Sequence, residues 1–201
     1  MNPSKIVCVG LNYKRHAAEL SLSVPEEPVI FLKPPSSMIG SGDLIHYPDK
    51  VTRVDYEAEL GVVIHKTCRN VDKDSALRYI YGYCCVNDVT ARDIQTKEVQ
   101  WTRAKSYDTF CPVGTIVKKE NVDPSNLKIC SYVNDEIKQN SNTSDMIFTV
   151  AECISFISSI MTLLPGDLIL TGTPEGIGPL NRGDQVRVEI EGFPVLINSV
   201  S

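Results

Sequence analysis

The sequence has no C-x-x-C pair, no G-x-G-x-x-G motif and only three histidines. Its seven cysteines are unevenly spaced and stand mostly among apolar neighbours. This pattern is typical of buried free thiols, and it disfavours a disulfide framework or a thiolate metal site. The strand-glycine-helix pattern around Gly10 lacks the further glycines of a dinucleotide site, so we expect no Rossmann-type cofactor.

Long apolar runs and an excess of positive charge are also missing. No apolar run approaches the roughly 20 residues needed to span a bilayer. The net charge is −5, and Lys and Arg are scattered along the chain. These features argue against a membrane or a nucleic acid as the main partner. The short apolar run near the N-terminus is unlike a signal peptide, so we expect a cytoplasmic protein.

Length and composition indicate one domain over residues 1–201. The chain is 42% apolar and 22% charged, which are ordinary globular proportions. We expect eight to ten short strands and two or three short helices, the clearest helix covering residues 150–163. A hairpin is expected over residues 127–139, with its turn at Asn134-Asp135. Because the strands do not alternate with long helices, the pattern predicts an α+β, β-rich domain folded as a roll or sandwich.

An acidic segment leads into a buried strand at residues 54–64. Asp55, Glu57 and Glu59 are spaced by two, so in an extended chain they lie on one face, about 6.6 Å apart. Either water on an exposed sheet face or a bound cation would relieve their repulsion and desolvation. Asp88, which ends a mostly apolar strand, is a candidate third ligand, or else a turn or cap residue. Three carboxylates without His or Cys suit Mg²⁺ or Mn²⁺, and Ca²⁺ less well.

Three further features offer reactive or binding groups. His16 and Glu19 share a helix face, where the carboxylate would orient the imidazole as a general base; the alternative is a pair exposed to water. Lys105 is a cation that could hold a carboxylate or enolate oxygen, or simply a surface lysine. The loop at residues 171–178 offers backbone N–H groups and hydroxyls to an anionic ligand, unless it is an ordinary β-turn.

Motifs that are weak one by one occur in a specific order along nearly the whole chain. They are Gly10-Leu11-Asn12-Tyr13 with His16 and Glu19, Phe31-Leu32-Lys33-Pro34, Asp55-Tyr56-Glu57-Ala58-Glu59-Leu60, residues 87–95, Lys105 with Asp108, Cys111-Pro112-Val113 and residues 170–178. This series resembles the fumarylacetoacetate hydrolase family, and most closely its short members that act as acylpyruvases or on oxaloacetate. The resemblance implies a β-rich roll with mixed sheets, usually assembled as a homodimer.

The resemblance also implies a set of site residues. It implies a Mg²⁺ or Mn²⁺ ion held by Glu57, Glu59 and Asp88, and a mobile lid within about residues 10–25. The further residues that it implies are His16, Glu19 and Lys105 in catalysis and Lys33, Arg92, Gln95 and Thr173 in substrate binding. On this reading Asp55 is a structural residue that orients a metal-bound water or Lys105.

The implied substrates carry a 2-oxo acid or a 1,3-diketone, which can chelate a divalent ion. We expect hydrolysis of a C–C bond in acylpyruvate-type 2,4-dioxo acids, such as fumarylpyruvate or acetylpyruvate, through a metal-stabilised enolate. His16 and Glu19 favour this reaction because together they can activate water. The alternatives are decarboxylation or keto–enol tautomerisation of oxaloacetate, a related hydratase or isomerase reaction, and a non-catalytic dicarboxylate-binding protein. Leu11 stands where the family often has Arg, which leaves the preferred substrate open.

Overall fold

The structure is a computed structural model that describes residues 2–201, with the backbone alone at Asn121. Within these residues the chain forms sixteen strands and five short α-helices. The predicted α+β, β-rich fold with mixed sheets is confirmed. The expected number of strands was too low because several strands have only two residues, too few to show any periodicity.

A six-stranded mixed sheet forms the centre of the molecule, in the order β10-β7-β6-β13-β1-β2. Its strands are β1 (Ile6–Gly10), β2 (Val29–Lys33), β6 (Ala58–Ile64), β7 (Ile80–Asn87), β10 (Val117–Lys118) and β13 (Leu168–Leu170). The pair β1–β13 is parallel, and the other neighbours are antiparallel. Because β1 pairs with β13, the 171–178 loop that follows β13 lies beside residues 10–13 at the end of β1.

A second sheet has five strands in the order β12-β11-β15-β16-β4. They are β4 (Leu44–Ile45), β11 (Lys128–Val133), β12 (Glu136–Asn142), β15 (Gln185–Ile190) and β16 (Leu196–Val200). The predicted hairpin is confirmed, because β11 and β12 pair antiparallel around Asn134 and Asp135. Both turn residues have positive φ, 49° and 66°, as the tight turn between twisted strands requires.

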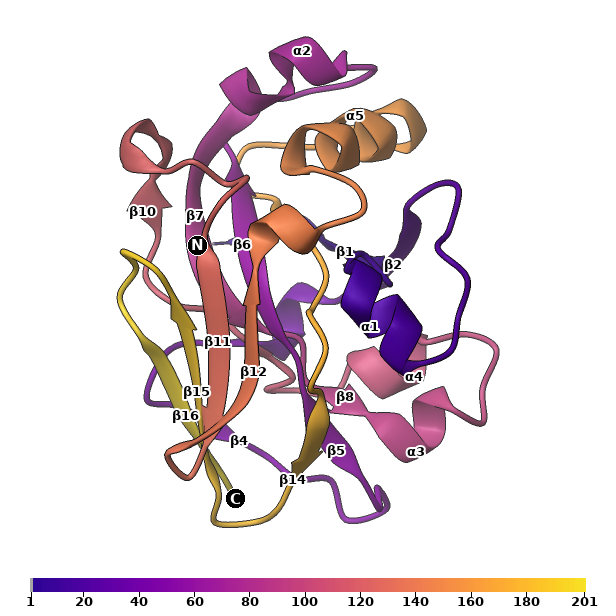
Figure 1. Cartoon of the computed structure of the whole chain (residues 1–201), viewed down its shortest axis with the longest axis vertical. Coiled ribbons are helices and arrows are strands. Elements are labelled where there is room, and N and C mark those ends of the chain that lie inside the picture. The colour runs from indigo at the N-terminus through magenta and orange to yellow at the C-terminus, as the bar shows by residue number, and fades with distance from the viewer. Residues whose placement is uncertain (1) are drawn as a thin grey trace.

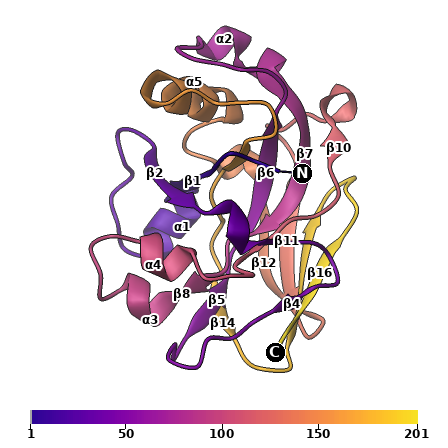
Figure 2. The ribbon, with the colours of Figure 1, turned by 180° about the vertical axis from the view of Figure 1, so that it is seen from behind.

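Two small sheets and the helices complete the chain. The small sheets are β14 (Gly178–Leu180) with β5 (Val54–Tyr56) and β8 (Thr90–Ala91), and β3 (Met38–Ile39) with β9 (Cys111–Pro112). The α-helices are α1 (Lys14–Glu19), α2 (Lys73–Ala76), α3 (Arg92–Gln95), α4 (Thr102–Lys105) and α5 (Val150–Ile160), and the 3₁₀ turns are Pro35–Ser37, Leu77–Tyr79, Lys119–Asn121 and Thr143–Asp145. Figures 1 and 2 show α2 and α5 at one end of the molecule and α1, α3 and α4 together on one side.

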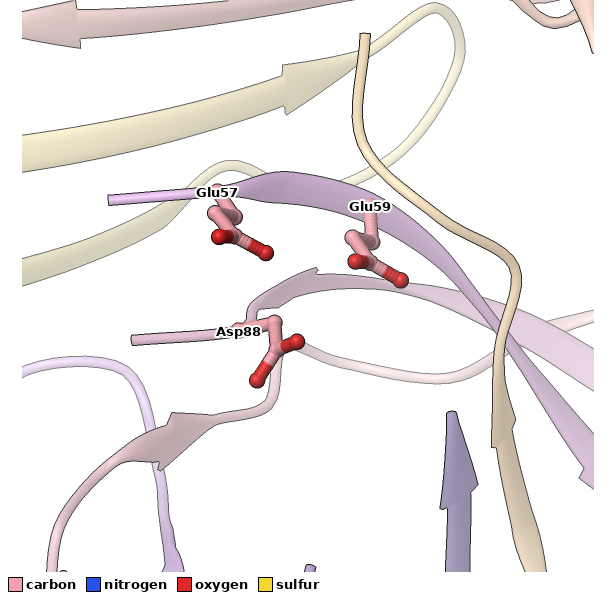
Figure 3. A group of neighbouring side chains, drawn as sticks. All are labelled: Glu57, Glu59 and Asp88. Carbon is pink, nitrogen blue, oxygen red and sulfur yellow. The ribbon is translucent and has the colours of Figure 1, made fainter. Parts of the chain in front are cut away.

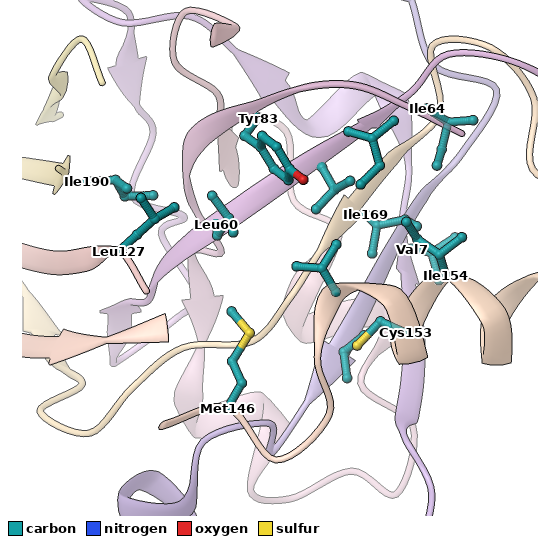
Figure 4. Close-up of a cluster of buried hydrophobic side chains, with 14 of the residues drawn as sticks. Val7, Leu60, Ile64, Tyr83, Leu127, Met146, Cys153, Ile154, Ile169 and Ile190 are labelled. Carbon is teal, nitrogen blue, oxygen red and sulfur yellow. The ribbon is translucent and has the colours of Figure 1, made fainter. Parts of the chain in front are cut away.

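The main core lies between the two large sheets and α5 (Figure 4). Leu60 and Ile169 come from the six-stranded sheet, Ile190 from the five-stranded sheet and Ile154 from α5. All seven cysteines are buried and unpaired, as predicted. Among the described residues, no helix is long and apolar enough to cross a membrane.

Truncating Ile154 should destabilise the fold strongly. This side chain is fully buried in the main core, and Ile→Ala at such a site costs about 2–5 kcal/mol. Ile160 is 49% exposed on the same helix, so Ile160→Ala is the matched control and should change stability by about 0.5 kcal/mol or less. Urea unfolding measures both values, and equal losses would contradict the assigned core face of α5.

Candidate active site

Strand pairing brings three carboxylates together near the centre of the molecule. The antiparallel pairing of β6 with β7 places Ala58 opposite Asn87, so the residues that flank them, Glu57 and Asp88, become neighbours. The backbone N–H of Asp88 donates to the carbonyl of Glu57 at 2.8 Å. Carboxylate oxygens of Glu57, Glu59 and Asp88 all lie within 4.8 Å of one another, and Figure 3 shows the two glutamates on one segment of the chain, at the start of β6, with Asp88 beside them.

These carboxylates are not on a solvated sheet face. The exposed fractions are 5% for Glu57, 2% for Glu59 and 0% for Asp88, so the exposed-face alternative is wrong. Burial opposes ionisation of Glu57, but Lys105 and Arg92 outweigh it and hold the pKa of Glu57 well below its usual range. Burial, together with the charges of Asp88 and Glu57, raises the pKa of Glu59 well above its usual range.

The donor set fits a hard divalent cation. Glu59 forms no ion pair with a described Lys or Arg residue. Among the described residues, its carboxylate accepts one hydrogen bond, from the backbone N–H of Gly172 at 2.7 Å. Three converging carboxylates, one of which has no cation of its own, suit Mg²⁺ or Mn²⁺, which prefer oxygen ligands. A cation here would offset the repulsion that raises the pKa of Glu59.

Two buried lysines flank the acids. Lys105 donates to Glu57 at 2.8 Å and to Asp88 at 2.6 Å, and Lys33 donates to the other oxygen of Asp88 at 2.6 Å. Both lysines are almost fully buried, so the surface-lysine alternative for Lys105 is wrong. Burial disfavours the charged form of Lys105, but Asp88 and Glu57 outweigh it and raise its pKa. Lys105 is therefore a fixed ammonium group beside the acids.

Asp55 organises a pair of arginines rather than Lys105. Its buried carboxylate accepts from Arg53 at 2.7 and 3.0 Å and from Arg92 at 2.8 Å. Arg92 also donates to Glu57 and to the side-chain oxygen of Gln95. The predicted contact between Asp55 and Lys105 is absent from the described residues, because Lys105 donates to Glu57 and Asp88 instead.

His16 and Glu19 meet on α1 at the edge of the same site. Nδ1 of His16 lies 3.0 Å from one carboxylate oxygen of Glu19, and the other oxygen accepts the backbone N–H of Gly176 at 3.1 Å. The imidazole is buried, whereas the Glu19 side chain is 36% exposed. The carboxylate therefore holds Nδ1 and leaves Nε2 as the free ring nitrogen.

The 171–178 loop binds carboxylates of the protein itself. The N–H of Gly172 donates to Glu59 and that of Gly176 to Glu19. Both glycines have positive φ, 96° and 91°, and a Cβ would lie 2.7 Å from Asn12 at the first and 2.3 Å from the Lys138 carbonyl at the second. Glycine is thus required at both positions. These two N–H groups do not serve a ligand, which corrects the predicted anion-binding role of the loop for them.

Gln139 is a positioning residue that the sequence did not reveal. Its side-chain oxygen accepts from the Ala58 N–H at 3.0 Å, and its nitrogen donates to the Thr173 hydroxyl at 2.8 Å. Thr173 donates in turn to the Ala58 carbonyl at 2.9 Å. Gln139 therefore ties β12 to the start of β6 and to the loop. In the sequence it is one more polar residue of a hairpin strand, so no local signal marks it.

These groups share one cavity of about 480 Å³. Its wall includes the three acids and Lys105, and also His16, Glu19, Arg92, Gln95 and Thr173. Leu11, Leu20, Leu22, Phe31, Trp101 and Ile177 contribute apolar wall, and Arg53 also lines it. Lys33 does not line this cavity and instead supports Asp88 from behind, which differs from its predicted contact with substrate.

Comparison with known proteins identifies the family. The profile described as "Fumarylacetoacetate (FAA) hydrolase C-terminal" matches residues 5–201. The chain belongs to the fumarylacetoacetate hydrolase family. The oxaloacetate tautomerase FAHD2A of Bos taurus, a mitochondrial protein, is 45% identical over 209 residues, which cover 98% of this chain and 67% of the bovine protein. The predicted family is confirmed, and the chain is an enzyme of this family.

Two solved structures of family members are similar throughout. A 2-hydroxyhepta-2,4-diene-1,7-dioate isomerase from Mycobacterium marinum has a TM-score of 0.92 and 46% identity, covering 100% of this chain and 75% of that one. A fumarylpyruvate hydrolase from Pseudomonas aeruginosa, in complex with Mn²⁺ and pyruvate, has a TM-score of 0.94 and 31% identity, covering 98% and 89%. Hydrolases, isomerases and tautomerases thus share this fold.

Proposed function

We propose that this fumarylacetoacetate hydrolase family enzyme hydrolyses a C–C bond in acylpyruvate-type 2,4-dioxo acids, with a divalent cation as cofactor. The observation that carries the proposal is that His16, backed by Glu19, faces the same cavity as Glu57, Glu59 and Asp88. A base and a cation-binding triad in one cavity are the parts that this hydrolysis needs. The Mn²⁺ of the P. aeruginosa hydrolase supports the choice of ion.

In this proposal Glu57, Glu59 and Asp88 hold the ion, with Mg²⁺ or Mn²⁺ preferred and Ca²⁺ less suitable. When bound, the ion supplies a Lewis acid for the 2-oxo acid end of the substrate. Lys105 adds a fixed positive charge beside the oxygen on which negative charge develops. Arg92, Gln95 and Thr173 line the cavity and orient the remainder of the substrate.

His16 carries the proton transfers. With Nδ1 held by Glu19, Nε2 accepts a proton from water as the water oxygen bonds to the distal carbonyl carbon. The bond between that carbon and the neighbouring methylene carbon then breaks, and its electron pair passes into the enolate formed by the methylene carbon and the 2-oxo group, whose oxygen lies beside Lys105. His16 returns the proton to the methylene carbon, which yields pyruvate and a carboxylic acid. The proton count balances without a further reactant.

Tautomerisation of oxaloacetate is the second candidate. It is favoured by the bovine oxaloacetate tautomerase, which is 45% identical over almost the whole chain, compared with 31% for the fumarylpyruvate hydrolase. The same residues would serve, since His16 would move a proton between carbon and oxygen without attack by water. Decarboxylation of oxaloacetate and isomerisation of a related 2-oxo acid would use the same cation site and Lys105, and they remain alternatives.

A substrate panel separates these reactions. The metal-loaded protein is incubated with acetylpyruvate, fumarylpyruvate and the keto and enol forms of oxaloacetate, and the loss of each is followed by absorbance and product analysis. We expect an acylpyruvate to be cleaved to pyruvate and an acid. Conversion of oxaloacetate without cleavage of any acylpyruvate would overturn the hydrolase proposal. Binding of a dicarboxylate with no turnover of any compound would favour a non-catalytic binding protein.

The proposal includes the organisation of the chain. We propose that residues 1–201 act as a single catalytic domain in a cytoplasmic homodimer, with about residues 10–25 as a mobile lid that carries His16 and Glu19. The contacts of Glu19 with Gly176 and of Arg15 with Glu175 would hold this lid against the 171–178 loop. Light scattering on the purified protein would measure the number of subunits.

A further inference from the structure

Arg53 lies on the solvent side of the row of acids formed by Asp55, Glu57 and Glu59. Arg53 directly precedes β5, Asp55 lies in β5, Glu57 joins β5 to β6 and Glu59 lies in β6, so the four residues follow one another at a spacing of two. Successive members are about 6.6 Å apart along an extended strand, so Arg53 lies farthest from the carboxylate triad. Its side chain is 49% exposed, compared with 14% for Arg92, and it lines the same cavity. It therefore stands at the mouth.

The guanidinium of Arg53 is held in place. Asp55 accepts from Nε at 2.7 Å and from Nη2 at 3.0 Å, a two-point contact that fixes the plane of the group. The carbonyl of Arg53 also accepts the backbone N–H of Arg92 at 2.8 Å, which ties the two arginines together. A mobile surface arginine would have neither constraint.

Arg53 also keeps more free donors than the other fixed cations of the cavity. Arg92 uses Nε, Nη1 and Nη2 on Asp55, Gln95 and Glu57, and Lys105 is engaged by Glu57 and Asp88. Among the described residues, Nη1 of Arg53 has no partner. The side-chain oxygen of Gln95 accepts from Arg92, so the NH₂ group of the Gln95 amide takes no part in that contact and remains a donor.

The rest of the outer cavity offers an anion little else. Leu11, Leu20, Leu22 and Ile177 line the cavity with apolar surface, and Leu20 and Leu22 lie toward solvent, 42% and 49% exposed. A substrate with a terminal carboxylate would bury that charge against these side chains at a cost unless a cation met it. The remaining acid near the opening, Glu19, is occupied by His16 and Gly176.

We propose that Arg53, assisted by the amide of Gln95, forms an anion subsite that binds the far carboxylate of an elongated dicarboxylic 2-oxo acid. This inference rests on the proposed function, because the 2-oxo acid end must occupy the triad and Lys105. It deepens that function, because the preferred substrates are then dicarboxylates longer than oxaloacetate. In oxaloacetate itself the second carboxylate lies too close to the first to reach the mouth of the cavity. Monocarboxylic acylpyruvates would lack this contact.

Binding of two stable ligands tests the subsite independently of turnover. 2-Oxoadipate and 2-oxohexanoate have the same chain length and the same 2-oxo acid end, and only the former has a terminal carboxylate. We expect the metal-loaded protein to bind 2-oxoadipate at least about tenfold more tightly in calorimetry, the gain typical of a charge-assisted hydrogen bond. Arg53→Leu should abolish this preference and leave the affinity for 2-oxohexanoate within about twofold, and Arg53→Lys should retain part of it.

The outcomes separate the subsite from the proposed function. Equal affinities of the wild-type protein for the two ligands, or binding of neither, would overturn the subsite. If Arg53→Leu lowered the affinity for both ligands equally, Arg53 would act only by supporting Asp55 and Arg92. That result would also overturn the subsite. If the preference is present and depends on Arg53, the subsite holds even where the substrate panel shows no hydrolysis, and only the assigned reaction would then be wrong.

Discussion

Replacing Glu57 or Asp88 with alanine is expected to abolish binding of Mg²⁺ and Mn²⁺ in calorimetry, and activity with it. Each variant removes one of three carboxylates whose oxygens lie within 4.8 Å of one another. Two carboxylates that remain beside Lys105 hold too little negative charge to retain a divalent ion in competition with water. In the wild-type protein, the ion at 100 times its dissociation constant should add about 2.7 kcal/mol to stability, and this gain should vanish in both variants.

A further variant distinguishes loss of the cation site from unfolding of the protein. Removing Glu57 or Asp88 leaves a buried lysine with fewer partners, which can cost about 3–5 kcal/mol. Glu59→Gln leaves every ion pair of the site intact, since Glu59 has none, and it should also lose the ion. Asp74 is an exposed acid on α2, at one end of the molecule, so Asp74→Asn is the control and should bind the ion normally. Full-strength binding by Glu59→Gln and Asp88→Ala would refute the triad as the cation site.

His16→Ala is expected to lower hydrolysis by about 10²-fold or more while leaving the affinity for the ion unchanged. His16 contacts Glu19 and lines the cavity but donates to none of the three acids. The loss should therefore appear in kcat, with the stabilisation by the ion retained in thermal unfolding. Glu19→Gln should cause a smaller loss, because the imidazole remains but is no longer oriented by a charge.

The control for this experiment is another histidine of the chain. His65 is exposed and follows β6 at the end away from Glu59, so His65→Ala should leave kcat unchanged. Unchanged hydrolysis in His16→Ala would remove the histidine from the mechanism. A parallel loss of affinity for the ion would instead indicate that His16 supports the triad.

The sequence by itself determined the fold class and the hairpin. The turn at Asn134 and Asp135 was predictable because these residues tolerate positive φ, a local property of the two side chains. The acidic row was visible for a similar reason, since a spacing of two places Glu57 and Glu59 on one face of a strand. The role of Asp88 depended on family resemblance, because an acid that ends a strand is equally compatible with a turn.

Only the tertiary structure decided which partners these acids have. The pairing of β6 with β7 brings Asp88 beside Glu57, and the chain then supplies Lys33 and Lys105 from β2 and α4 to the same buried point. Asp55 was expected to orient a metal-bound water or Lys105, yet its carboxylate holds Arg53 and Arg92. Spacing along one strand specifies the face on which a side chain lies, but contacts across sheets depend on packing between distant segments. For the same reason Gln139, and the free guanidinium donors of Arg53 at the cavity mouth, emerged only from the folded chain.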